Sequence, residues 1–218
     1  MIRALQTAGS EVWVTVTTPA EAELAADAGA EVLVLQGSEA GGHRGSFVDD
    51  PADDASGGFG LLSLLQLVRS RTSLPVVAAG GIGTGAALAA VLAAGAAAAQ
   101  IGTAFLRCPE AGTSQVQRAA VASAAPTAMT RAFTGRLARG IRNRFMDGYN
   151  APTAYPEVHY LTAPLRAAGR RSGDPDLVNL WAGQTHELSR ELPAAALVAE
   201  LAGEARDTLA ATSRSLGG

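Results

Sequence analysis

The sequence predicts an α/β fold built around a parallel sheet, on the strength of two features of its first half. Short apolar segments alternate with Ala-rich or amphipathic segments, in the order expected of strands and helices. Two of these segments, Val32–Leu35 and Leu74–Ala79, are unbroken apolar runs, as in strands buried on both faces. Strand–helix units repeated at this spacing form right-handed crossovers, and therefore a parallel sheet.

The expected elements begin with a strand over Glu11–Thr18, where apolar residues alternate with polar ones. A helix follows, with Thr18 as its cap, Pro19 at its first position and Gly29 at its end. The long segment Ser38–Gly58 is rich in Gly, Asp and Ser, and loops of such length tend to be functional. The remaining expected elements are a helix at 61–68, a strand at 74–79, a helix at 84–94 and a weaker strand at 97–105.

After Arg107 the alternation stops, and we expect the remainder of the chain to be mostly helical. Irregular segments are expected at 148–156 and 169–175, and a closing helix at about 193–213 should pack on the outside. The basic segment Arg131–Arg144 is interpreted as a solvated helical face or a subunit contact.

Composition excludes several classes of function. The net charge is −3, with 17% charged residues and no basic run with interleaved aromatics, so no nucleic-acid partner is expected. Cys108 is the only cysteine, which rules out an intrachain disulfide and fits a reducing compartment. No signal peptide or run of about 20 strongly apolar residues is present, so we expect a cytoplasmic protein with no membrane partner. Without a close His, Cys, Asp and Glu cluster, no metal site is expected.

The glycines of Ala79–Gly85 lie between an expected buried strand and a helix, where backbone N–H groups can reach an anion. Phosphate binding and a plain tight turn are both open on this motif alone. A dinucleotide site would need an acidic residue about 20 positions on, to hold the ribose. The first acidic residue after the glycines is Glu110, beyond the next strand, which weakens the dinucleotide interpretation.

A barrel explains the same residues better, because barrel phosphates commonly sit between the loops after two adjacent strands. Gly80 and Gly81 would end one strand, and Gly102 and Thr103 would end the next. Two such strand ends together are more specific than either alone, and they predict a phosphate site.

The segment Gln36–Gly45 also follows a buried strand, at the edge where α/β proteins bind ligands. Gln36 offers a donor and an acceptor suited to a heterocycle edge. His43 lies among glycines and is the candidate general base, although a lone loop histidine is more often exposed and idle. Glu39 is expected to orient the loop or to pair with Arg44. His159 and His186 are expected to be structural.

These segments together resemble the nitronate monooxygenase family, formerly called 2-nitropropane dioxygenases. The matching stretches are QGSEAGGHRG at 36–45, AAGGI at 78–82, QIGTAF at 100–105, TRAFTG at 130–135 and WAGQ at 181–184. The resemblance implies an FMN-carrying (β/α)8 TIM barrel, of which this chain would supply the C-terminal half and a helical C-terminal segment. It divides the chain into a half-barrel at 1–110 and a mostly helical, substrate-side segment of the same domain at 111–218.

The resemblance also assigns residues. His43 matches the family's catalytic histidine, and Gln36 and Gly41 would contact the flavin. The phosphate end would be held by Gly80, Gly81, Gln100, Gly102 and Thr103. The implied reaction is the FMN-dependent oxidation of an alkyl nitronate by O2 to a carbonyl compound and nitrite, with a small-molecule substrate.

One departure from the family is that about four further strands precede Glu11 in its members, whereas Met1 stands ten residues before it here. A homo-oligomer that completes the barrel is one expectation, because sheets with open edges tend to pair. FMN-dependent NAD(P)H:quinone or enoyl-ACP reductases, a truncated inactive remnant, and a phosphate-binding module without redox chemistry remain as alternatives.

Overall fold

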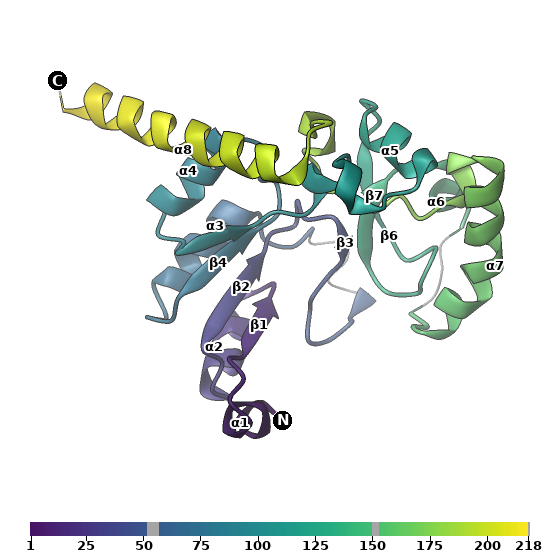
Figure 1. The fold of residues 1–218 in the computed structure, drawn as a ribbon. Coiled ribbons are helices and arrows are strands. Elements are labelled where there is room, and N and C mark those ends of the chain that lie inside the picture. Colours follow the sequence, from purple (N-terminus) through teal and green to yellow (C-terminus); the bar gives the residue numbers. More distant parts are fainter. Residues whose placement is uncertain (52–56, 150–152, 218) are drawn as a thin grey trace.

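The computed structural model describes residues 1–51, 57–149 and 153–217, and all statements below concern these residues. Two sheets lie side by side, with a long C-terminal helix running above the first (Figure 1). The first sheet has four parallel strands in the order β1-β2-β4-β5. Their bounds are β1 Trp13–Val16, β2 Val32–Gln36, β4 Val76–Ala79 and β5 Ala98–Gln100.

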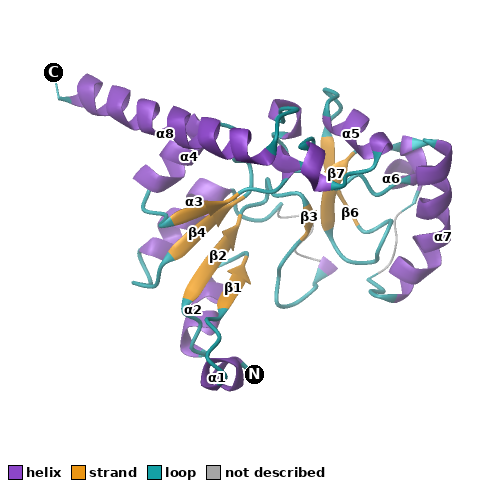
Figure 2. Cartoon of the chain, in the orientation of Figure 1, coloured by secondary structure: helices purple, strands orange, loops and turns teal. Residues whose placement is uncertain are grey.

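The predicted strand–helix units are confirmed in this first sheet, except that the strand expected at 97–105 ends at Gln100 and a 3-10 helix, η2 (Thr103–Phe105), takes its second half. Helices α2 (Pro19–Asp27), α3 (Leu61–Arg69) and α4 (Gly85–Ala93) follow the strands in turn and cover one face (Figure 2). The Thr18 hydroxyl caps α2 by accepting from the N–H of Glu21 at 3.1 Å. A short helix α1, Ile2–Thr7, precedes β1.

The core lies between the strands and these helices. Leu33, Leu35 and Val76 point into it from the strands, and Leu64 and Leu65 meet them from α3. The opposite faces of the strands carry a smaller buried cluster, made of Val32, Val34, Val77 and Ala79. Residues buried on both faces explain why the central strands read as unbroken apolar runs.

A second, antiparallel sheet was not predicted. It has the order β3-β7-β6, in which β3 is Gly42–His43, β6 is Thr127–Thr130 and β7 is Ala138–Ile141. The expectation of a mostly helical second half is wrong there. The sequences TAMT and ARGI carry a single β-branched apolar residue, so neither shows a strand pattern.

The basic segment Arg131–Arg144 is therefore not a solvated helical face. It forms β7 and its flanking turns, and both Arg131 and Arg139 are buried. Arg139 donates to the carbonyl of Ser38 at 2.7 Å and to the Thr127 hydroxyl at 3.1 Å. Arg131 pairs with the Asp49 carboxylate at 2.8 Å and donates to the Gly135 carbonyl at 3.2 Å. Both arginines thus have partners inside the protein, which a count of charges along the chain does not reveal.

Helices surround this second sheet. The expected irregular segment 169–175 is helical as far as Ser172, because Gly173, with φ +73°, ends α7 as a left-handed cap. Within the other irregular segment, 148–156, residues 150–152 lie outside the described part of the chain. The remaining elements are α5 Gln115–Val121, α6 Arg144–Gly148, α7 Glu157–Ser172, η2 Thr103–Phe105, η3 Pro109–Ala111, η4 Pro175–Leu177 and η5 His186–Leu188.

The closing helix α8, Ala194–Leu216, is confirmed and lies along α4 (Figure 1). Leu197 and Leu201 are buried against Ala104 and Cys108, in the segment after β5, whereas Val198 is exposed. Because the end of the chain packs on the first half, the division at residue 110 stays a prediction. Within the described residues, no helix is both long enough and apolar enough to cross a membrane.

Gly85 is where α8 touches α4 most closely, and a side chain there should destabilise the fold. A Cβ atom at Gly85 would lie 2.6 Å from the backbone nitrogen of Ala205 and 2.6 Å from the carbonyl oxygen of Leu201. We expect Gly85→Ala to lower the free energy of unfolding by about 1–3 kcal/mol, measured by urea denaturation.

The matched control is Gly203→Ala on α8, where an added Cβ has no atom within 4 Å. Removing a glycine from a helix interior should stabilise the protein by about 0.5–1 kcal/mol. If Gly85→Ala unfolds at the same urea concentration as the unmodified chain, the close packing of α8 on α4 is refuted.

Candidate active site

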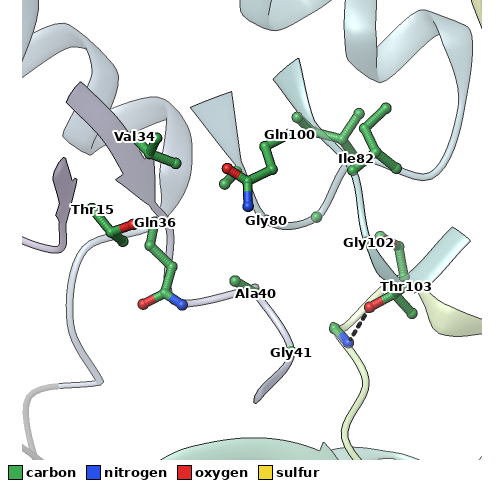
Figure 3. Close-up of a pocket in the computed structure, with 15 residues that line it drawn as sticks. Thr15, Val34, Gln36, Ala40, Gly41, Gly80, Ile82, Gln100, Gly102 and Thr103 are labelled. Carbon is green, nitrogen blue, oxygen red and sulfur yellow. Dashed lines mark hydrogen bonds between the residues drawn. The ribbon is translucent and has the colours of Figure 1, made fainter. Parts of the chain in front are cut away.

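A cavity of about 190 Å³ lies at the carboxyl ends of the parallel strands, the edge where barrels and open α/β sheets bind ligands. It is lined from β1, β2, β4 and β5 and from the loops that follow them (Figure 3). The structure brings all seven predicted cofactor-binding residues together in its wall. They are Gln36, Gly41, Gly80, Gly81, Gln100, Gly102 and Thr103.

The wall after β4 is shaped by glycines that no other residue could replace without strain. Gly80 has φ +114° and Gly81 has φ +67°, in the region that L side chains rarely adopt. A Cβ atom on Gly80 would lie 3.0 Å from the backbone nitrogen of Ala40. The loop after β4 thus packs directly against the loop after β2, and together they bound the cavity.

Backbone N–H groups are the anion donors that this wall offers. Those of Gly81, Ile82 and Gly102 donate no hydrogen bond within the described part of the chain. A Cβ atom on Gly102 would have no protein atom within 4 Å, so the space beside it is open. Unpaired N–H groups next to open space are the arrangement that binds phosphate.

The first turn of α4 offers fewer free N–H donors to an anion than its sequence indicates. The N–H of Gly85 donates to a carboxylate oxygen of Glu204 on α8 at 2.7 Å, and the N–H of Ala87 donates to the Thr84 hydroxyl at 3.2 Å. These first-turn donors are capped by protein side chains. Binding of an anion therefore depends on the glycine loop that precedes the helix.

Thr103 and Gln100 add side-chain donors from β5 and the turn after it. The Thr103 hydroxyl oxygen accepts from the N–H of Gly183 at 3.0 Å, which leaves its proton available to a ligand (Figure 3). The amide of Gln100 has no hydrogen-bond partner among the residues that the structure describes. Both groups are thus available to a polar ligand in the cavity.

Both ends of the Gln36 side-chain amide already form hydrogen bonds within the protein. Its Nε2 donates to the carbonyl of His43 at 2.9 Å, and its Oε1 accepts from the N–H of Gly45 at 2.8 Å. The side chain thus holds the loop 41–45 in place. One amide proton and one lone pair remain for a heterocycle, so the predicted contact with the flavin stays a prediction.

The residues present fit the phosphate side of FMN. Unpaired backbone donors, a free hydroxyl proton and open space at Gly102 suit a phosphate, with no acidic side chain in the wall. The volume of the cavity, about 190 Å³, is below the roughly 300–1,000 Å³ typical of complete ligand pockets. The cavity therefore fits a part of a ligand as large as FMN.

His43 lies beside this cavity and is not part of its wall. It sits on β3, two residues after Gly41, and pairs with Ala138 of β7. Its ring meets those of Trp181 and Tyr155 edge to face, with centroids 5.5 and 6.2 Å away. Nε2 lies 2.9 Å from the hydroxyl oxygen of Thr134. The histidine is thus held by packing and a hydrogen bond, unlike an idle loop side chain.

The electrostatic surroundings keep His43 neutral. Burial is the largest cause that lowers its pKa below the ordinary value of 6.5, and the positive charge of Arg136 lowers that pKa further. His159 and Arg166 act in the same direction, whereas Asp49 opposes them. A neutral imidazole near pH 7 is the form that can accept a proton.

Glu39 and Arg44, in the loop after β2, have structural roles. Both carboxylate oxygens of Glu39 lie 3.0 Å from the N–H of Leu61, at the start of α3, and Arg44 donates to the Gly37 carbonyl at 2.7 Å.

His186 is also structural, as predicted. It is buried, and its two ring nitrogens face the carbonyl oxygens of Val121 and Ala125. Among the described residues, no group of three His, Cys, Asp or Glu side chains could hold a metal ion.

Several site residues were missed by sequence reasoning. Thr15, Gly183 and Thr185 also line the cavity, and Thr134 holds His43. Thr134 and Gly183 lie in the stretches TRAFTG and WAGQ, so the resemblance marked their segments without giving them a role. No sequence feature marks Thr15 as a site residue, because its place in the cavity wall follows only from the order of the strands.

A phosphate-competent cavity at the carboxyl ends of parallel strands, beside a held histidine, defines a ligand-binding protein of the (β/α)-barrel class. The model of the nitronate monooxygenase family matches residues 1–204. The chain belongs to this family, as its sequence motifs predict.

Similar proteins agree with this assignment. A nitronate monooxygenase of Pseudomonas aeruginosa is 46% identical over 94% of this chain and 60% of its own length. One from Paraburkholderia phytofirmans is 41% identical over 96% and 58%, respectively. The chain thus spans about three fifths of the curated relatives it matches.

Solved structures show the same fold. Nitroalkane oxidase from Streptomyces ansochromogenes superposes with a TM-score of 0.94 at 50% identity, over 97% of this chain and 62% of that one. FabK from Thermotoga maritima gives a TM-score of 0.81 at 25% identity, over 98% and 67%. The fold is that of part of a TIM barrel, as predicted.

Proposed function

We propose that this chain binds FMN through the cavity at the strand ends and takes part in oxidising alkyl nitronates with O2, to a carbonyl compound and nitrite. The observation that carries the proposal is that seven predicted residues from three separate sequence segments line one cavity, with His43 beside it. Membership of the family and the similarity to a nitroalkane oxidase support it. A location in the cytoplasm, where FMN and reduced thiols are present, is part of the proposal.

Each part of the wall has a role in this proposal. The backbone N–H groups of Gly81, Ile82 and Gly102 and the Thr103 hydroxyl would hold the phosphate of FMN. Gln36 and Gly41, on the His43 side, would contact the flavin. Bound FMN supplies the electron-transfer chemistry that no side chain of the site can perform.

His43 would take the α proton of a neutral nitroalkane, which gives the nitronate, since a nitronate has already lost this proton. A neutral imidazole accepts a proton near pH 7, and the low pKa of His43 preserves that form. The positive charges of Arg136 and Arg166 nearby favour the anionic nitronate over a neutral compound. The Trp181 and Tyr155 rings give the histidine an apolar border that limits water.

An FMN-dependent NAD(P)H:quinone or enoyl-ACP reductase is the second candidate. The fold is shared with FabK, and a phosphate-binding wall with a held histidine serves either chemistry. The two differ in their electron donor. Oxidation of NAD(P)H in the absence of nitronate would favour the reductase.

We also propose a partner, because both edges of the parallel sheet are open in the described chain. β1 and β5 each pair on one side only, and Trp13 on β1 is 54% exposed. A second copy could pair β1 with β5 of the first, closing a parallel barrel around the cavity. Light scattering should then give twice the chain mass of 22.0 kDa at micromolar concentration. A single-chain mass at every concentration would rule out this partner.

The cavity is tested by placing a charge at Gly102. Its φ is −114° and its Cβ position is open, so Gly102→Asp should fold normally and put a carboxylate into the cavity. A phosphate and a carboxylate about 4 Å apart repel by several kcal/mol at the effective dielectric of a protein surface. We expect the FMN dissociation constant, measured by quenching of flavin fluorescence, to rise at least tenfold.

Gly102→Asn is the matched control, because it has nearly the same volume without the charge. It should bind FMN within a few-fold of the unmodified chain. Equal affinity in the Asp and Asn variants would place the phosphate elsewhere. A colourless chain that takes up no FMN would contradict the proposed cofactor itself.

His43 is tested by turnover and its pH dependence. His43→Ala should lose at least about a hundredfold in kcat/KM for a neutral nitroalkane while FMN affinity stays unchanged, since His43 lies outside the cavity wall. Because burial and Arg136 lower the pKa of His43, kcat/KM should fall only as the pH drops below 6.5. Full turnover in the variant would contradict the role of His43 as the base. So would a fall in kcat/KM that begins above pH 6.5 as the pH is lowered.

A further inference from the structure

The hydroxyl of Thr134 stands between the His43 ring and a backbone carbonyl. Its oxygen lies 2.9 Å from His43 Nε2 and 3.1 Å from the carbonyl oxygen of Arg136. Thr134 is 1% exposed, so solvent cannot rearrange these contacts. The backbone N–H of Arg136 also donates to this oxygen, at 3.4 Å, so one buried hydroxyl serves three groups that differ in what they can accept or donate.

Counting protons decides the direction of both bonds. A carbonyl oxygen only accepts, and a hydroxyl has a single proton to give. The Thr134 proton must therefore point to the Arg136 carbonyl, which has no other donor among the described residues. Turning that proton to His43 would leave the carbonyl unpaired, at a cost of about 1–3 kcal/mol. The hydroxyl consequently accepts from His43, and Nε2 carries a proton.

We infer that Thr134 fixes the tautomer of His43 with its proton on Nε2, so that Nδ1 carries the lone pair that acts as the base. Thr134 is then a positioning residue, which acts on substrate only through His43. The assignment of Nδ1 as the base rests on the proposed function, whereas the tautomer does not.

The charge state supports a single ring proton. Burial and the nearby arginines lower the pKa of His43, so the imidazolium with protons on both nitrogens is disfavoured near pH 7. Nδ1 has no hydrogen-bond partner among the described residues. It is therefore the nitrogen that remains available to a bound substrate.

Thr134 is itself held rigidly. The preceding Phe133 is buried against Phe145, and its carbonyl accepts from the Thr162 hydroxyl of α7 at 2.6 Å. The following Gly135 has φ +79°, and its N–H donates to the Arg131 carbonyl at 2.7 Å. A hydroxyl fixed on both sides can impose an orientation on the ring that contacts it.

The experiment compares Thr134→Val, which keeps the shape and removes the hydroxyl, with Thr134→Ser, which keeps the hydroxyl. Long-range ¹H–¹⁵N NMR of the ¹⁵N-histidine-labelled chain at pH 8 reports which His43 nitrogen is protonated, with His43→Gln to assign its signals. We expect the Nε2–H form in the unmodified chain and in the Ser variant. In the Val variant the Nδ1–H form should become populated.

Turnover provides the second measurement. We expect kcat/KM for a neutral nitroalkane to fall about tenfold or more in the Val variant and to stay within about threefold in the Ser variant, with FMN affinity unchanged in both. Urea denaturation confirms that both variants fold.

The outcomes separate this inference from the proposed function. A proton on Nδ1 in the unmodified chain, or an unchanged tautomer in the Val variant, overturns the role of Thr134 whatever the turnover. If the chain shows the predicted tautomers but no nitronate turnover, Thr134 is supported as the residue that sets the tautomer of His43, and the proposed reaction is refuted.

Discussion

The two-residue pairing between β3 and β7 is the interaction on which the rest of the site depends. It joins Gly42 to Arg139 and His43 to Ala138, and it is the only ladder between the loop after β2 and the second sheet in the described chain. Without it, the histidine would not face the turn that carries Thr134. The short pairing is reinforced by Arg139, which donates to the Ser38 carbonyl, and by Gln36, which holds the His43 carbonyl.

Glycines make this convergence possible, because three segments approach within backbone contact. A Cβ atom on Gly41 would clash with the backbone of Ala182 and Gly183, and Gly183 in turn donates to Thr103. The loops after β2 and β5 and the segment before η5 thus meet with no side chain between them. Any larger residue at Gly41 would separate the cavity wall from the segment that carries Trp181, which borders His43.

The sequence was sufficient to predict the parallel sheet and the residues that line the cavity. It was insufficient to predict the second sheet. Buried parallel strands show as apolar runs, and Gly80 and Gly81 mark a strand end by composition alone. The hairpin of β6 and β7 is held by Arg139 and by the close approach of Gly140 to the Leu180 carbonyl, with 2.9 Å to an added Cβ. Such long-range contacts leave no periodic pattern in the chain, and Thr134 gains its role only when this hairpin folds.

The two halves of the proposed site would attract anions by different physical means. The cavity wall uses backbone N–H groups, whose partial charges need no counterion and stay fixed by the glycine loops. Around His43 the field comes from arginines. Arg166 is buried with its guanidinium on the His159 carbonyl and the Thr162 hydroxyl, and it has no carboxylate partner among the described residues. A buried charge without a carboxylate partner is costly to the folded state. In the proposed reaction, this positive charge near a neutral base would stabilise an anionic nitronate without protonating the histidine.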